Sequence, residues 1–326
     1  MKLLINIFCV IFFLTVIVFS VYSQNAEYTV RYGLVEPDTD PVGITANEFA
    51  RILSEKSNGR IEIKVFPNGQ LGNAIEIMEG LMLGNTQMGN LFTGVLSNNI
   101  IEFSILDLPF AMKDYTNAYR ILDGELKEKL GELTLQRGLR LLGFLDWGFR
   151  MMYSNRSPIK TLEDLKGIKI RTPESSLFIK TYRLFGANPT PIPAAELYTA
   201  LQTGVVDAYD NSLGSAAAFK WGEVTKYASL TSHMFSCGAL LINEKFFQKL
   251  PNDLQEIVVA SAEEAIKAHR GRVAEISKLS LEELKKQGVK EFNVPDMTPF
   301  KEAVSPLWDE WRNKSKEIAE LMKLLD

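Results

Sequence analysis

Residues 253–286 read DLQEIVVASAEEAIKAHRGRVAEISKLSLEELKK, with no proline and one glycine, Gly271. Apolar and small residues recur through this segment at helical spacing: Leu254, Ile257, Val258, Ser261, Ala265, Ala268, Val273, Ile276, Leu279 and Leu284. A helix of about 30 residues is ~45 Å long at about 1.5 Å per residue, which is longer than one small domain is wide. The pattern therefore predicts a single helix that lies across two lobes.

Strand and helix patterns alternate through the chain that precedes this segment. Strands are expected at 28–34, 61–65, 87–92, 139–147, 168–171 and 205–209, and helices around 46–53, 75–82, 175–185 and 194–203. In the second of these helices Ile75, Met78 and Met82 share one face, and Gly84 ends it. Residues 299–325 are expected to add one or two packing helices. Repeated β-α-β units with short loops predict an α/β protein whose sheets are covered by helices.

The N-terminal 23 residues differ from the rest of the chain. Lys2 gives a short positive region, residues 3–19 are almost entirely apolar, and small or neutral residues stand at Val21 and Ser23. This layout is typical of a secretory signal peptide that is cleaved after Ser23. The alternative is an N-terminal membrane anchor, because ~17–20 apolar residues can just span a bilayer. The prediction is an exported, periplasmic protein.

The composition excludes several classes of protein. The chain has 326 residues, of which 46% are hydrophobic and 23% charged, with a net charge of −4. These values are typical of a globular protein with a well-buried core. Basic runs with interleaved aromatics are absent from the sequence, so no nucleic-acid partner is expected.

The residues that usually carry catalysis do not form a recognisable pattern. Cys9 lies in the predicted signal peptide, which leaves Cys237 as the only cysteine of the mature chain and excludes a disulfide framework. Cys237 is expected to be a small buried residue, with a nucleophilic role as the weaker alternative. His233 and His269 are isolated and are expected to be surface or satisfied interior histidines. We predict a protein that is not an enzyme and uses no cofactor or metal.

Arg171 is the residue most suggestive of a binding site. It ends a short apolar strand just before Pro173, and Arg150 precedes it in the segment Gly148–Phe149–Arg150. In an open α/β sheet, ligands lie beyond the carboxyl ends of the strands. A guanidinium placed there can hold a carboxylate through two parallel hydrogen bonds. From spacing alone, a salt bridge to a neighbouring acidic residue is an equal alternative.

Several motifs, in the same order, resemble one family of binding proteins. They are Ser57–Asn58–Gly59 with Ile61–Glu62–Ile63, residues 66–72 (FPNGQLG), Asp107–Leu108–Pro109–Phe110, and a block with Pro189, Pro191, Glu196–Leu197–Tyr198, Leu201–Gln202, Gly204, Asp207 and Asp210–Asn211. Across essentially the whole mature chain, the sequence resembles the extracytoplasmic solute-binding proteins of TRAP (tripartite ATP-independent periplasmic) transporters.

This resemblance implies a two-lobed clamp, like other periplasmic binding proteins. Each lobe is expected to hold a mixed or mostly parallel sheet, joined to the other by hinge crossovers and by the long helix. The expected division is residues 1–23 for the signal peptide, 24–147 with 236–275 for lobe I, and 148–235 with 276–326 for lobe II. The implied partners are a small-molecule carboxylate ligand and the membrane permease subunits of a TRAP transporter.

The resemblance also implies roles for individual residues. Arg171 matches the family arginine that pairs with the ligand carboxylate, Arg150 matches a second arginine, and Asn211 an amide donor. Asn211 has the alternative of a turn residue that caps its own backbone. Further ligand contacts are expected from Trp147 and Phe92, as an aromatic wall, and from Asp210 and Asn90, as partners for hydroxyl groups. For Trp147 and Phe92, plain core packing is nearly as good an interpretation.

The nature of the ligand follows from positions where sialic-acid-binding members of the family are polar. This chain has Val35, Ala74, Phe92 and Ala194 at or near those positions. Buried hydroxyl groups without partners would cost about 1–3 kcal/mol each there, which argues against sialic acid. A smaller sugar acid, such as a uronate or aldonate, or a dicarboxylate is expected instead. The alternatives are a receptor that presents the acid to a signalling partner, and a secreted hydrolase.

Overall fold

The structure is a computed structural model that describes residues 26–325. The predicted signal peptide and Cys9 lie outside these residues. Within the described part of the chain, the helices are all too short or too polar to cross a membrane.

The described residues form a ten-stranded sheet in the order β2-β1-β3-β9-β4-β7-β5-β6, with β8 paired to β4 and β10 to β8. The strands are β1 (Tyr28–Gly33), β2 (Ile61–Phe66), β3 (Met88–Phe92), β4 (Leu139–Ser154), β5 (Lys169–Thr172), β6 (Asn188–Pro191), β7 (Ala208–Ser212), β8 (Tyr227–Ser229), β9 (Phe235–Asn243) and β10 (Glu291–Asn293). The β1 strand runs parallel to β2 and β3, and β5 runs parallel to β6 and β7, whereas β9 is antiparallel to β3 and β4, and β4 is antiparallel to β7. Both halves of the sheet are therefore mixed, as expected.

The β4 strand carries the chain from one half of the sheet into the other. Its residues 139–149 pair with β9, and its residues 150–154 pair with β7. The register shifts between Asp146 and Gly148, and Gly148 adopts a φ of 80° that glycine tolerates best. The prediction that this strand ends at Trp147 was wrong. The bulge shifts the register at Gly148 without ending the strand, and residues 150–154 continue it by pairing with β7. The predicted lobe boundaries themselves stay a prediction.

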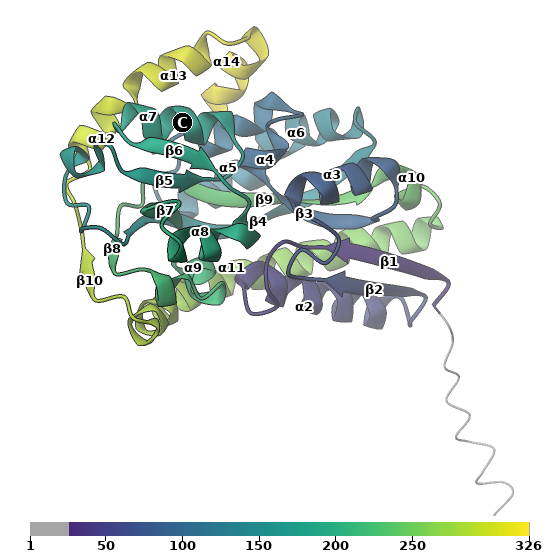
Figure 1. The fold of residues 1–326 in the computed structure, drawn as a ribbon. Helices are drawn as coiled ribbons and strands as arrows, with labels where there is room; N and C mark the ends of the chain where they lie inside the picture. Colours follow the sequence, from purple (N-terminus) through teal and green to yellow (C-terminus); the bar gives the residue numbers. More distant parts are fainter. Residues whose placement is uncertain (1–25, 326) are drawn as a thin grey trace, which may run out of the picture.

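Helices flank both halves of the sheet (Figure 1). They are α2 (Pro41–Lys56), α3 (Ala74–Leu83), α4 (Thr93–Leu96), α5 (Tyr115–Asp123), α6 (Glu125–Leu135), α7 (Ser176–Leu184), α8 (Leu197–Gln202), α9 (Leu213–Ala218), α10 (Glu244–Phe247), α11 (Asn252–Gln287), α12 (Thr298–Ala303), α13 (Ser305–Arg312) and α14 (Lys316–Met322). Short 3-10 helices complete the set: η2 (Ile101–Asp107), η3 (Leu162–Leu165), η4 (Ala194–Glu196), η5 (Trp221–Val224) and η6 (Lys323–Leu325).

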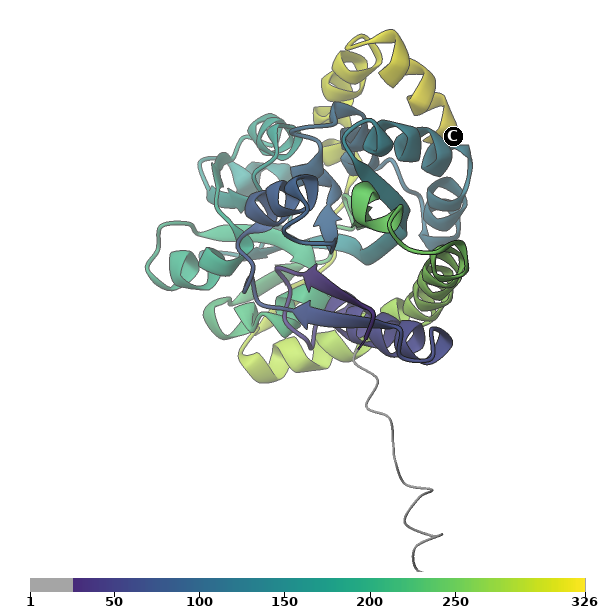
Figure 2. The same ribbon diagram turned by 90° about the vertical axis from the view of Figure 1, so that its right-hand side faces the viewer.

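The α11 helix confirms the prediction of one helix that spans both lobes. It has 36 residues, and at about 1.5 Å per residue it is about 54 Å long. It packs against α2, where His269 bonds to Thr45, and against α9 and η5, where Gln287 at its end donates to the Ala217 carbonyl. Figures 1 and 2 show it running beneath both halves of the sheet, beside α2. Ile266 belongs to the core of the first lobe and Leu284 to the core of the second.

The buried face of α3 differs from the face that the sequence suggested. Ile77, Met78 and Leu81 are buried, whereas Met82 is 43% exposed. The helix sequence AIEIMEGLML is apolar on most sides, so its periodicity does not single out one stripe. The strand predicted at 205–209 is also displaced, because the N–H groups of Val205 and Val206 donate to the Ala200 carbonyl at the end of α8.

Both histidines are buried residues whose ring nitrogens have hydrogen-bond partners, which is one of the two interpretations that the sequence left open. His233 Nε2 lies 2.9 Å from the Tyr182 hydroxyl, and His269 Nδ1 lies 2.7 Å from Thr45 Oγ1. Cys237 is buried, as predicted.

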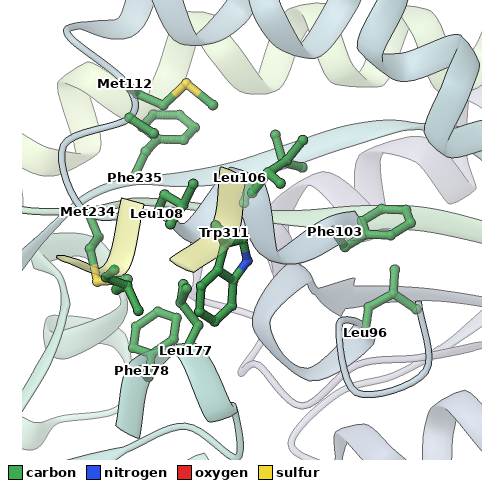
Figure 3. Close-up of a cluster of buried hydrophobic side chains, with 14 of the residues drawn as sticks. Leu96, Phe103, Leu106, Leu108, Met112, Leu177, Phe178, Met234, Phe235 and Trp311 are labelled. Carbon is green, nitrogen blue, oxygen red and sulfur yellow. The ribbon is translucent and has the colours of Figure 1, made fainter. Parts of the chain in front are cut away.

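The C-terminal segment forms three short helices, α12 to α14 (Figure 1). Their side chains belong to the largest core cluster, part of which is drawn in Figure 3. Trp311 on α13 is fully buried in this cluster, and its Nε1 donates to Ser104 Oγ at 2.7 Å. The predicted one or two helices were thus too few, since Ser305–Pro306 and Ser315 each start a new helix.

Candidate ligand-binding site

A cavity of about 360 Å³ lies between the two halves of the sheet. From the first half, it is lined by residues that follow β1 and by side chains of β3 and β4. From the second half, it is lined by residues at the carboxyl end of β5, by β7 and by η4. Beyond the carboxyl ends of strands is where an open α/β sheet holds its ligands.

Most of the sequence-predicted site residues line this cavity. They are Arg171, Arg150, Asn211, Trp147, Phe92 and Asn90, and the apolar positions Val35, Ala74 and Ala194 line it as well. Asp210 is the exception, because it is fully buried outside the cavity lining. The structure therefore brings together residues from four strands that the sequence could only place one at a time.

Arg171 is a buried cation that forms no salt bridge among the described residues. Its side chain is 3% exposed, and its Nε donates to the Ile192 carbonyl at 2.7 Å. The charges of Asp210 and Glu174 favour its cationic form, but less than burial and Arg150 disfavour it. Burial, and then the nearby charge of Arg150, lower the pKa of Arg171 to about 10. This pKa shift marks a charged form that the protein destabilises, as expected for a cation that awaits an anion.

Arg150 is equally buried but fully paired. Its Nε lies 2.5 Å from Asp210 Oδ2, its Nη2 lies 3.1 Å from Asp210 Oδ1, and its Nη1 donates to Ser236 Oγ at 3.1 Å. Burial alone would raise the pKa of Asp210, but Arg150 and His233 hold it well below its usual range. Asp210 thus neutralises Arg150 and fixes its orientation.

Aromatic rings surround the Arg150 guanidinium. Its central carbon lies 5.6 Å from the centroid of the Phe92 ring and 5.0 Å from that of Phe178, within cation–π range. Trp147 meets Phe92 edge to face at 6.1 Å. Phe92 and Trp147 therefore pack against the core and also line the cavity. Their placement fits both interpretations from the sequence, an aromatic wall of the site and plain core packing.

Asn211 lies within β7 and not in a turn. Its Oδ1 accepts from the N–H of Ser212 at 2.8 Å, which fixes the orientation of the amide. Its Nδ2 has no partner among the described residues and is left as a donor at the cavity. Asn90 is 3% exposed, and neither polar atom of its side chain has a partner. Buried amides are nearly always hydrogen bonded, so Asn90 lacks a partner that a bound molecule would supply.

Glu36 is a cavity residue that the sequence analysis missed. It follows the carboxyl end of β1, and its Oε2 is buried without a partner. Behind it, Asp40 caps α2 and accepts from Trp147 Nε1 at 3.0 Å and from Ser215 Oγ at 2.7 Å. Burial raises the pKa of Glu36, and Asp40 raises it further. Its position just after a strand was the available signal, but no motif accompanies it.

These features define a class of protein. A cavity between two lobes, crossed by shared strands and one long helix, is lined by a guanidinium without a salt bridge and by Asn90, whose buried amide has no partner. That is the arrangement of a solute-binding protein that takes up a small polar molecule.

Comparisons with known proteins agree and give the family. Residues 32–314 match the family described as bacterial extracellular solute-binding protein, family 7 (DctP), and the chain belongs to this family. It is 33% identical over 309 residues to the 2,3-diketo-L-gulonate-binding periplasmic protein YiaO of Escherichia coli, covering 93% of both chains. It is 30% identical to the C4-dicarboxylate-binding periplasmic protein DctP of Rhodobacter capsulatus, covering 85% of this chain and 84% of that protein.

A solved structure gives the same result for the fold. A TRAP periplasmic solute-binding protein from Sulfitobacter sp. NAS-14.1, with bound β-D-galacturonate, superposes with a TM-score of 0.88 at 31% identity, covering 91% of this chain and 99% of that one. The predicted resemblance to TRAP solute-binding proteins is confirmed, and so is the two-lobed α/β fold. The family consists of binding proteins, and the relatives named here are periplasmic.

The contrast between the two arginines predicts opposite effects on stability. Arg150→Met leaves the Asp210 carboxylate buried with only His233 beside it, so we expect the free energy of unfolding to fall by about 3–5 kcal/mol. Arg171→Met removes a buried charge that has no partner, so we expect little change or a rise of about 1 kcal/mol. Urea denaturation of the ligand-free proteins measures both values. An equal loss in the two variants would show that Arg171 is compensated by a group that this account lacks.

Proposed function

We propose that this protein captures a small organic acid in the cavity, closes its lobes over it and delivers it to the membrane permease of a TRAP transporter. The unneutralised guanidinium of Arg171 is the single observation that carries the proposal. The relatives support it, because diketogulonate, C4-dicarboxylates and galacturonate, the molecules in their names, are all acids.

In this proposal, the ligand carboxylate pairs with the two Nη groups of Arg171. Planar guanidinium and carboxylate groups form two parallel hydrogen bonds, which orient the ligand as well as bind it. The Nδ2 of Asn211 adds a donor at the cavity, and Arg150, whose N–H groups are occupied by Asp210, Ser236 and Asn211, adds positive charge. Asp210 acts on Arg150 and not on the ligand, since both its oxygens face that guanidinium. We assign Phe92 and Trp147 to the wall against the carbon skeleton.

Closure would take place about the segments that join the lobes. These are β4 with its bulge at Gly148, β9 and α11. A ligand that contacts both walls stabilises the closed form, because only that form makes both sets of contacts. We also propose that residues 1–23 direct export to the periplasm, where the relatives act.

Replacing Arg171 by lysine keeps the charge and removes the paired geometry. For the tightest ligand in a panel of uronates, aldonates and C4-dicarboxylates, we expect at least about 30-fold weaker binding. Isothermal titration calorimetry measures it. Arg183→Lys, on the exposed surface of α7, is the matched control and should bind normally. Full affinity in Arg171→Lys would refute the proposed carboxylate contact.

Ligand should also make the molecule more compact. If the lobes close about β4, β9 and α11, small-angle X-ray scattering should show a smaller radius of gyration with saturating ligand than without it. Arg171→Lys at the same ligand concentration serves as the control that stays open. An unchanged radius, with binding established by calorimetry, would contradict the closing of the lobes.

A further inference from the structure

The charges on the cavity wall are unequally distributed. Among the described residues that line the cavity, the cations are Arg150 and Arg171, and both come from the second half of the sheet or its border strand. Asp210 already neutralises Arg150, so Arg171 alone remains to balance an anion. The acidic side chains of the lining are Glu36, Glu76, Glu174 and Glu196. A ligand with two carboxylates would thus find one free cation and several negative groups.

The part of the cavity wall that comes from the first half of the sheet offers hydrogen bonds without positive charge. It carries the amides of Asn68, Asn73 and Asn90, together with the carboxyl group of Glu36. The Asn90 side chain occupies space that Gly238 leaves open on β9, because a Cβ at Gly238 would come within 2.5 Å of Asn90 Nδ2. An amide has both a donor and an acceptor, and a hydroxyl group matches both. The unpaired atoms of Asn90 therefore suit ligand hydroxyls.

Glu36 sits against a second buried acid. Burial raises the pKa of Asp40 to about 6, although hydrogen bonds from Ser215 Oγ, Val42 N and Trp147 Nε1 favour its charged form. Above that pH this corner of the cavity holds negative charge close to the unpartnered Glu36 Oε2. Another carboxylate placed there would have no cation to offset its desolvation.

We propose that this cavity selects acids with one carboxylate and several hydroxyl groups, and rejects dicarboxylates, with Glu36 as the residue that sets the choice. The inference rests on the proposed function and narrows it. The carboxylate lies on Arg171, and the hydroxyl end of the ligand lies against Asn90 and Glu36. Uronates and aldonates have this layout, whereas C4-dicarboxylates place a second charge at the wrong end.

The selectivity should depend on pH. Burial, followed by the charge of Asp40, raises the pKa of Glu36 to about 8. Besides Asp40, the hydroxyl of Tyr32 on β1 lies near it, and Arg150, Arg171 and Glu76 line the same cavity. Below its pKa Glu36 is neutral and donates a hydrogen bond, and above it Glu36 repels a second carboxylate. Rejection of diacids should thus strengthen from pH 6.5 to pH 9.

The test uses two pairs of ligands that differ only in the group at carbon 6, D-galactonate against galactarate and D-gluconate against D-glucarate. At pH 9, where Glu36 is mostly charged, we expect the wild-type protein to prefer the better monoacid over its diacid about 10-fold more strongly than Glu36→Gln does. At pH 7.5 and pH 6.5, where Glu36 is mostly neutral, this additional preference should nearly vanish. Glu36→Gln should prefer the monoacid over its diacid only slightly, and to the same extent at each pH. Glu263→Gln, on the exposed face of α11, is the control and should behave as wild type. Thermal melts of each variant verify folding.

Two outcomes would overturn the inference in different ways. Diacids that bind wild type as tightly as the monoacids at pH 9 would refute the charge selection and leave acid capture intact. Absence of binding by every acid in the panel, D-galacturonate and succinate included, would refute the proposed function and the inference with it. A pH-dependent ratio that persists in Glu36→Gln would show that Glu36 is not the residue responsible.

Discussion

The buried guanidinium of Arg171 is the constraint on which the site depends. The end of β5 and the Ile192 carbonyl hold it in place, and neither neutralises it. Arg150, on β4, shows the opposite solution, since Asp210 balances its charge and Ser236 takes one of its donors. Arg150 is thus a structural cation whose charge is neutralised, whereas the charge of Arg171 is not neutralised by a salt bridge. An unbalanced buried charge costs stability, which a protein retains where function requires it.

The fold makes this site closable because β4 belongs to both halves of the sheet. Its bulge at Gly148 separates residues that pair with β9 from residues that pair with β7. Trp147, on one side of the bulge, donates to Asp40, and Arg150, on the other side, reaches Asp210. The α11 helix ties the outer surfaces of the two halves together. The cavity therefore lies between two halves that are joined by β4, β9 and α11 and by a core cluster that contains residues of both.

Much of this could be predicted from the sequence, for identifiable reasons. The length of α11 followed from its periodicity, and the strand ends followed from glycine and proline signals. The arginines and Asn211 followed from motifs. What the sequence could not give depends on contacts between distant segments. The continuation of β4 depends on its pairing with β7, and the buried face of α3 depends on the elements packed against it. Asp210 lies outside the cavity lining and binds the Arg150 guanidinium, a contact between two strands that the sequence alone does not reveal. Glu36 and Asn90 stand out only through partners that they lack.

A crystal structure of the protein with its tightest acid ligand tests the central claim most directly. The account predicts that the ligand carboxylate lies within about 3 Å of both Nη atoms of Arg171, in the plane of the guanidinium. It also predicts that Arg150 keeps its contacts with Asp210. A ligand whose carboxylate is bound elsewhere in the cavity, with Arg171 facing an uncharged group, would contradict it.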